Sequence, residues 1–130
     1  MQLPTVAAYQ LIDNKHFDWI DQIFRDELPQ EAMDYDDQTI LELTEWLNEP
    51  IYYANQTFKG WLVGVEIQIF YKNELPVNFD MMEAEIKLAD LFQKNGWNIE
   101  QSKNHIRDPD TAQVSKVFYF SKNLIVKDGQ

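Results

Sequence analysis

The residues that could carry catalysis are few and widely separated. The 130-residue chain has only two histidines, His16 and His105, and no cysteine. Without cysteine, a thiol nucleophile, a thiolate zinc site and a disulfide framework are all excluded. Neither histidine lies in an HExxH motif, and the chain has no serine elbow and no glycine-rich phosphate loop. We therefore expect a protein that is not an enzyme, with no catalytic residue and no cofactor.

One acidic cluster has part of the spacing of a calcium-binding loop. Asp34, Asp36 and Asp37 are followed by Glu45 at the twelfth position counted from Asp34. Thr39 stands where such a loop requires glycine, and the second half of the segment alternates like a strand. A solvated acidic turn is therefore favoured, and no metal site is predicted.

Aromatic residues offer a third kind of chemistry, the stacking of sugar rings. The chain has four tryptophans, and residues 48–60, which have the composition of a loop, hold more aromatic side chains than solubility requires. Large aromatic residues more often form a core or a contact between subunits, and this interpretation is favoured. Strands with apolar residues on both sides, such as the one containing Ile40, also need a second layer or a neighbouring subunit. The interface candidates are Trp46, Tyr52, Tyr53, Phe58, Val117 and Tyr119.

The clearest predicted element is a helix over residues 80–95. Asp80 can cap its first turn, Glu83 follows three residues later, and Asn95 with Gly96 tolerates the backbone of a helix end. Helical spacing predicts that Glu85 faces solvent together with Lys87, Asp90 and Gln93. The predicted buried stripe consists of Met81, Met82, Ile86, Leu88, Ala89, Leu91 and Phe92.

The remaining segments predict a second helix and a sheet. Residues 4–13 form a short helix whose buried side holds Val6, Ala7, Tyr9 and Leu11 or Ile12. Residues 17–28 fit either a helix or a strand, and periodicity slightly favours a helix. The predicted strands cover residues 39–46, 61–72, 97–107 and 114–122. This order predicts one α+β domain over residues 1–130, with a mixed, mostly antiparallel sheet of about four or five strands and two helices packed on one face.

The charge of the chain is concentrated in its first part. The formal net charge is −11, and residues 1–50 carry twelve Asp or Glu against two Lys or Arg. Such a field disfavours tight binding to nucleic acid, whose phosphates it repels. The chain also lacks a signal-like apolar stretch near its start and any run long enough to cross a membrane. We expect a protein that neither spans a membrane nor is exported by a signal peptide.

Several local patterns together resemble the tail terminator family of long-tailed, non-contractile phages and their prophages. They are ELP at residues 27–29, ILELTEW at 40–46, GWLVGVEIQIFYK at 60–72, DMMEAEIKLADLF at 80–92 followed by NGW, and RDPDT at 107–111 before VFYF. The resemblance implies a small subunit that forms a ring, commonly of six copies, caps the tail tube and offers the surface to which the head attaches. It also implies that residues 17–28 contain a strand.

The implied partners are further copies of the chain, the major tail tube protein and a head-joining protein. The implied location is the virion tail, and the host cytoplasm during assembly. In a ring, an acidic wall could keep the passing genome from adhering, and its candidates are Asp34, Asp36, Asp37, Glu42 and Glu45. An acidic face that serves only solubility is an equal alternative for these residues. The alternatives are another head-to-tail joining protein, or a small acidic mimic of DNA that inhibits a host nucleic-acid-binding protein.

Overall fold

A computed structural model describes residues 1–29 and 36–125 of the chain. The described residues form two helices and a mixed sheet of six strands, so the predicted α+β class is confirmed, with one strand more than expected. In chain order the elements are α1 (Pro4–Lys15), β1 (Gln22–Arg25), β2 (Ile40–Ala54), β3 (Thr57–Phe70), α3 (Met81–Lys94), β4 (Asn98–Ser102), β5 (Ile106–Arg107) and β6 (Val114–Ile125).

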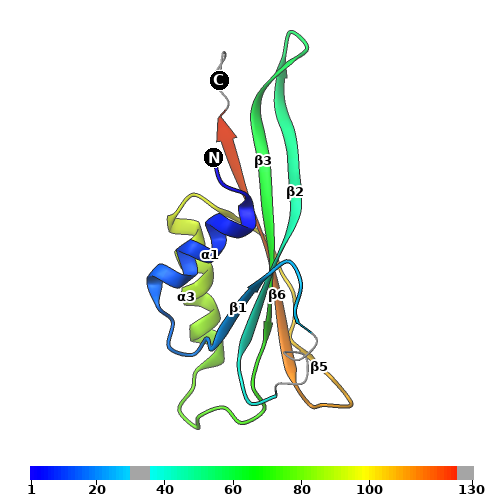
Figure 1. Cartoon of the computed structure of the whole chain (residues 1–130). Helices are drawn as coiled ribbons and strands as arrows, with labels where there is room; N and C mark the ends of the chain where they lie inside the picture. The colour runs from blue at the N-terminus through cyan, green and yellow to red at the C-terminus, as the bar shows by residue number, and fades with distance from the viewer. Residues whose placement is uncertain (30–35, 126–130) are drawn as a thin grey trace.

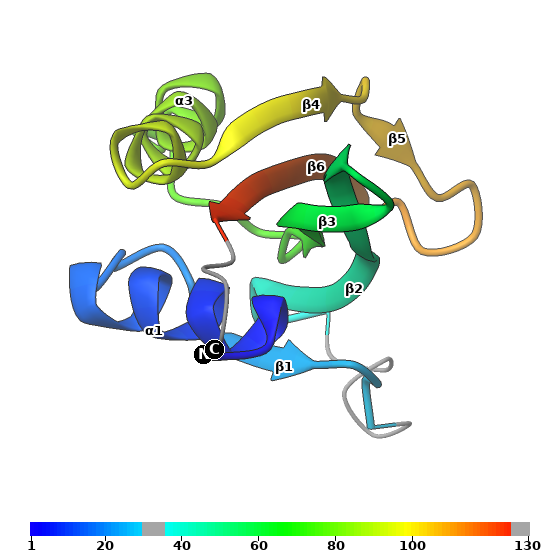
Figure 2. The ribbon, with the colours of Figure 1, turned by 90° about the horizontal axis from the view of Figure 1, so that it is seen from above.

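The strands lie in the order β1-β2-β3-β6-β4, and β5 pairs with β6 (Figures 1 and 2). Only β1 and β2 run parallel, and the other pairs are antiparallel. The last of the described strands, β6, thus lies in the middle of the sheet, between β3 and β4. The predicted strand over residues 97–107 is divided into β4 and β5, and the turn at residues 108–111 forms as expected, with Asp108 Oδ1 accepting the backbone N–H of Asp110 at 2.8 Å.

Helix α3 begins and ends where its sequence predicts. The Asp80 carboxylate accepts the backbone N–H of Glu83 at 3.0 Å, and the chain leaves the helix through Gly96, whose φ of 89° favours glycine. Its buried face differs from the prediction: Met82 and Ile86 are 69% and 56% exposed. The side chains that pack on the sheet lie on a neighbouring side of the helix. They are Ala84, Glu85, Leu88 and Phe92, and Met81 and Ala89 are partly buried beside them.

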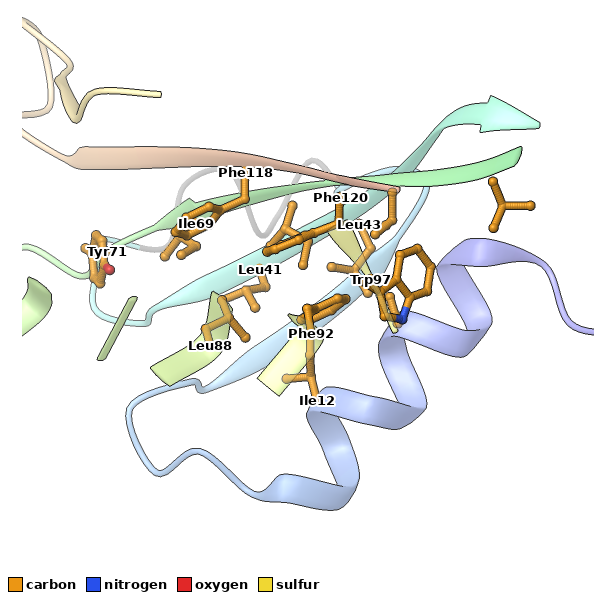
Figure 3. Packing of buried hydrophobic residues seen from close by; sticks show 14 residues of the cluster. Ile12, Leu41, Leu43, Ile69, Tyr71, Leu88, Phe92, Trp97, Phe118 and Phe120 are labelled. Atoms are coloured by element: carbon orange, nitrogen blue, oxygen red, sulfur yellow. The ribbon is translucent and has the colours of Figure 1, made fainter. Parts of the chain in front are cut away.

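Both helices pack on one face of the sheet, and the core lies between them and the strands (Figure 3). The rings of Phe92 and Phe120 stack with their centroids 4.4 Å apart, and Trp97 meets Phe92 edge-on at 5.7 Å. Helix α1 extends two residues beyond its predicted end. It buries Pro4, Thr5, Ala8 and Ile12, so of the predicted side only Ile12 is fully covered.

The uncertain segment at residues 17–28 contains strand β1 and no described helix. Its four strand residues pair in parallel with the start of β2, where Gln22 lies opposite Ile40. The residues just before the two strands are also joined, because the Asp21 carboxylate accepts the backbone N–H of Thr39 at 2.7 Å. The strand implied by the family resemblance is therefore correct for Gln22–Arg25, and the weak helical periodicity is misleading there.

Residues 48–60 do not form the predicted loop but the distal half of a long β-hairpin. Strands β2 and β3 continue to Ala54 and from Thr57, with Tyr53 opposite Phe58. Asn55 and Gln56 join them with φ values of 53° and 63°, the two left-handed residues of a tight primed turn. Figure 1 shows this part of the hairpin projecting past both helices.

Candidate functional site

Two of the predicted interface residues meet on the helix-free face of the sheet, the side of β2, β3 and β6 that carries Thr44, Glu66 and Tyr119. The rings of Trp46 and Tyr119 contact edge to face at 5.1 Å. Trp46 Nε1 also donates a hydrogen bond to the carbonyl oxygen of Phe120 at 2.9 Å. Trp46 thus spans β3 and reaches β6, and its side chain remains 37% exposed.

Gly64 makes room for this ring. A Cβ added at Gly64 would lie 2.5 Å from Trp46 Nε1, closer than real Cβ contacts come. Glycine inside a strand often marks such a close approach of another group. Part of the apolar surface that the sequence assigned to a partner is therefore covered within the chain, and Ile40, expected to need a second layer, is only 2% exposed.

We expect Gly64→Ala to destabilise the protein by about 1–3 kcal/mol, because the new methyl group displaces the Trp46 ring and breaks its bond to Phe120. Urea unfolding measures the cost. In a Trp46→Ala background the same change should cost less than about 0.5 kcal/mol, since the ring that it would strike is gone. Equal costs in the two backgrounds would show that Gly64 is needed for another reason.

A polar network surrounds Tyr119 on the same face. Thr44 Oγ1 donates to Glu66 Oε2 at 3.0 Å, and the Tyr119 hydroxyl donates to Glu66 Oε1. This bond to the carboxylate, with burial second, raises the pKa of Tyr119. Burial, and then the nearby charge of Glu66, raises the pKa of the Glu42 carboxyl. Val117 lies half-buried on this face, opposite Gln68, as a further predicted interface residue.

The other predicted interface residues gather at the end of the hairpin. Tyr53 is 65% exposed and Phe58, its cross-strand partner, is 37% exposed. Tyr52 has a φ of 59°, and its ring lies against Gly60 while its hydroxyl accepts a hydrogen bond from Asn123 at 3.0 Å. Tyr52 is nonetheless 59% exposed. The hairpin end therefore presents three aromatic side chains beyond the helical layer.

The acidic candidates do not form one continuous wall. Asp34 lies outside the described residues, and Asp36 and Asp37 are exposed just before β2. Because successive strand residues point to opposite faces, Glu42 lies on the helix-free face and Glu45 on the other. The structure thus places these four described acids at one end and on both sides of β2.

A buried polar cluster was missed by the sequence analysis. Glu85 is only 5% exposed, and its Oε2 accepts the Tyr71 hydroxyl at 2.5 Å and lies 2.7 Å from His105 Nε2. Burial, and then this hydrogen bond, raises the pKa of Tyr71. The cluster joins α3 to the end of β3 and to the connection between β4 and β5. The signal that could have revealed the cluster is the position of Glu85. It lies four residues after Met81 and four before Ala89, both of which belong to the predicted buried stripe.

Comparison with known families places the chain in one of them. Residues 2–125 match the model of the family described as "Protein of unknown function (DUF806)". The chain belongs to this family. In this DUF806 protein the match spans both described helices and all six described strands, from α1 to the last residue of β6. A comparison with curated proteins gave no match.

The described residues of this DUF806 protein contain no group of three or more His, Asp or Glu side chains placed to hold a metal ion. The aromatic residues considered for sugar stacking are dispersed: Trp97 is buried against Phe92, and Trp19 packs on Tyr71 and Phe79. Neither α1 nor α3 is long and apolar enough to cross a membrane.

Proposed function

We propose that this protein is a structural subunit of a phage or prophage tail, a ring-forming terminator that caps the tail tube and offers a surface for head joining. The observation that carries the proposal is the β2–β3 hairpin, whose end projects past the helices with Tyr52, Tyr53 and Phe58 exposed. Exposed aromatic clusters are typical of surfaces where proteins meet. The sequence resemblance supplies the kind of assembly.

A ring requires a heterologous contact, in which one patch of each copy meets a different patch of the next. The two outer sides of the described sheet offer different patches of this kind on one subunit, and the exposed hairpin end offers a further patch for a partner. In this proposal the helix-free face, with Glu42 and Glu66, is turned toward the bore, and the helices lie outside. The acidic wall stays a prediction for Asp36, Asp37 and Glu42.

The proposal gives the protein no catalytic role. The partners are other copies of the chain, six in the ring that the resemblance implies, together with the major tail tube protein and a head-joining protein. Assembly takes place in the host cytoplasm, and the product is part of the virion tail. The DNA-mimic alternative is less well supported, because carboxylates on opposite sides of β2 do not present one phosphate-like row.

The test is light scattering and electron microscopy of the purified chain with and without its cognate tail tube protein. The native chain should form rings or cap tubes of defined length, and the double variant Tyr53→Ser, Phe58→Ser should remain folded but lose this activity. Met82→Ser, Ile86→Ser is the matched control, because it removes exposed apolar side chains from α3. Tubes that grow without limit in the presence of the native chain would refute the proposal.

A further inference from the structure

Strand β2 has an unpaired edge along most of its length. Strand β1 covers it only from Ile40 to Leu43, and no described residue forms a strand pair with the same edge further on. Pro50 is consistent with this, because proline is tolerated in strands where its nitrogen faces an open edge. Since Pro50 cannot donate a backbone hydrogen bond, the stretch open to another strand is residues 44–49.

Strand β4 forms the opposite edge of the sheet (Figure 2). It pairs with β6 on one side, and no described strand lies on its other side. All five of its residues are exposed, including Ile99 at 41%. Natural proteins usually protect such edges with charged side chains. The one charged residue of β4, Glu100, is held by the Ser121 hydroxyl.

The two open edges lie at the same level of the sheet. Asn98 of β4 is opposite Ser121, which is opposite Gly64 of β3, which in turn is opposite Leu47 of β2. A rotation about an axis parallel to the strands would therefore bring β4 of one copy beside residues 44–49 of another. Strand polarity also fits, because β2 and β4 run in opposite directions within the sheet.

The edges also differ in charge. The open stretch of β2 carries two acids, Glu45 and Glu49, and no Lys or Arg. Residues 98–103, at the β4 edge, carry one acid and one base, Glu100 and Lys103. Two β2 edges would therefore repel each other, whereas a β2 edge meets no net negative charge on β4, which favours head-to-tail contact.

We propose that residues 44–49 of β2 in one copy pair antiparallel with residues 98–102 of β4 in the next copy, so that the sheet continues from subunit to subunit. The occupant of each edge is thus a second copy of this chain. This inference rests on the proposed ring function and specifies its subunit contact. Backbone hydrogen bonds between the edges provide affinity, and the charge difference sets the direction of assembly.

A charge-swap experiment tests the contact. The β4-edge variant Gln101→Glu, Lys103→Glu places three acids at that edge, facing Glu45 and Glu49 of β2. The β2-edge variant Glu45→Lys, Glu49→Lys supplies a positive edge that is complementary to it. All four positions are exposed, and circular dichroism checks that each variant is folded. The β4-edge variant alone should self-associate roughly tenfold or more weakly than the native chain in sedimentation equilibrium, because like charges then face each other.

Mixing the two variants should restore association, because the two altered edges attract each other and the remaining contact is the native one. The restored rings should contain both variants, and their formation should weaken with added salt. In the native ring, hydrogen exchange should show protection of backbone amides in residues 44–49 and 98–102. Asp18→Lys, Glu74→Lys is the matched control for the β2-edge variant, since it makes the same change in net charge away from both edges. It should associate like the native chain and should not restore association when mixed with the β4-edge variant.

The outcomes separate the contact from the function. If the native chain forms rings and caps tubes but each charge variant does so equally well, the edge contact is wrong and the terminator function stands. A mixture that stays dissociated, or native rings without protection at the two edges, also overturns the contact. If the native chain neither forms rings nor caps tubes, both proposals fail.

Discussion

Replacing Phe92 with alanine is expected to lower the free energy of unfolding by about 3–5 kcal/mol. Phe92 is fully buried, stacks on Phe120 at 4.4 Å and meets Trp97 edge-on at 5.7 Å. The change therefore removes a large side chain from the point where α3, β6 and the start of β4 join, and it leaves a cavity. Since domains of this size are stable by about 5–15 kcal/mol, we expect a large part of the stability to be lost.

Chemical denaturation in urea measures this loss, and Met82→Ala is the control. Met82 lies on the same helix and belonged to the predicted buried stripe, but it is 69% exposed. Its replacement should change the free energy of unfolding by no more than about 0.5 kcal/mol. Similar losses for the two variants would mean that α3 packs through a wider face than the structure shows.

Replacing Glu85 with alanine is expected to cost about 1–3 kcal/mol, because it removes the acceptor of a buried hydroxyl. Tyr71 is 1% exposed and donates its hydrogen bond to Glu85 at 2.5 Å. The loss of the carboxylate also frees His105 from α3. Amide hydrogen exchange should therefore become faster in the connection between β4 and β5, and the midpoint of urea unfolding should fall.

Glu85→Gln is the conservative variant for this cluster. The amide keeps a carbonyl oxygen that can accept the Tyr71 hydroxyl, but it carries no charge to attract His105. We expect it to retain more stability than Glu85→Ala and yet to show the faster exchange near His105. Unfolding midpoints of Glu85→Ala equal to those of the native chain would show that water satisfies Tyr71 when the carboxylate is absent.

The parts of the fold that the sequence predicted are those decided by neighbouring residues. The ends of α3 depend on Asp80 and on Gly96, and both act within one turn of the helix. The alternation at residues 61–72 and 114–122 likewise predicted the strands β3 and β6. The buried side of α3 could not be predicted in the same way. It depends on Tyr71, a residue of another element that supplies a partner for Glu85 and allows an acid into the core.

The hairpin and the interface candidates show a second limit. Pro50 and Asn55 suggested a loop, but Pro50 sits on an open edge and Asn55 occupies the turn itself, so neither interrupts the pairing. Trp46 could be assigned to a partner only while Gly64 was ignored, and glycine in the middle of a strand was the available signal of a close approach. The exposed positions of Tyr53 and Phe58 agree with their selection as candidates.

The central position of β6 affects how the chain is made. Strands β4 and β5 pair only with β6 among the described strands, and β6 is the last to leave the ribosome. Until then, translation can produce the hairpin and α3, but the two sides of the sheet remain unconnected and their apolar faces uncovered. The sheet therefore closes only once β6 has emerged, and a premature stop codon before Val114 would yield a product without a closed sheet.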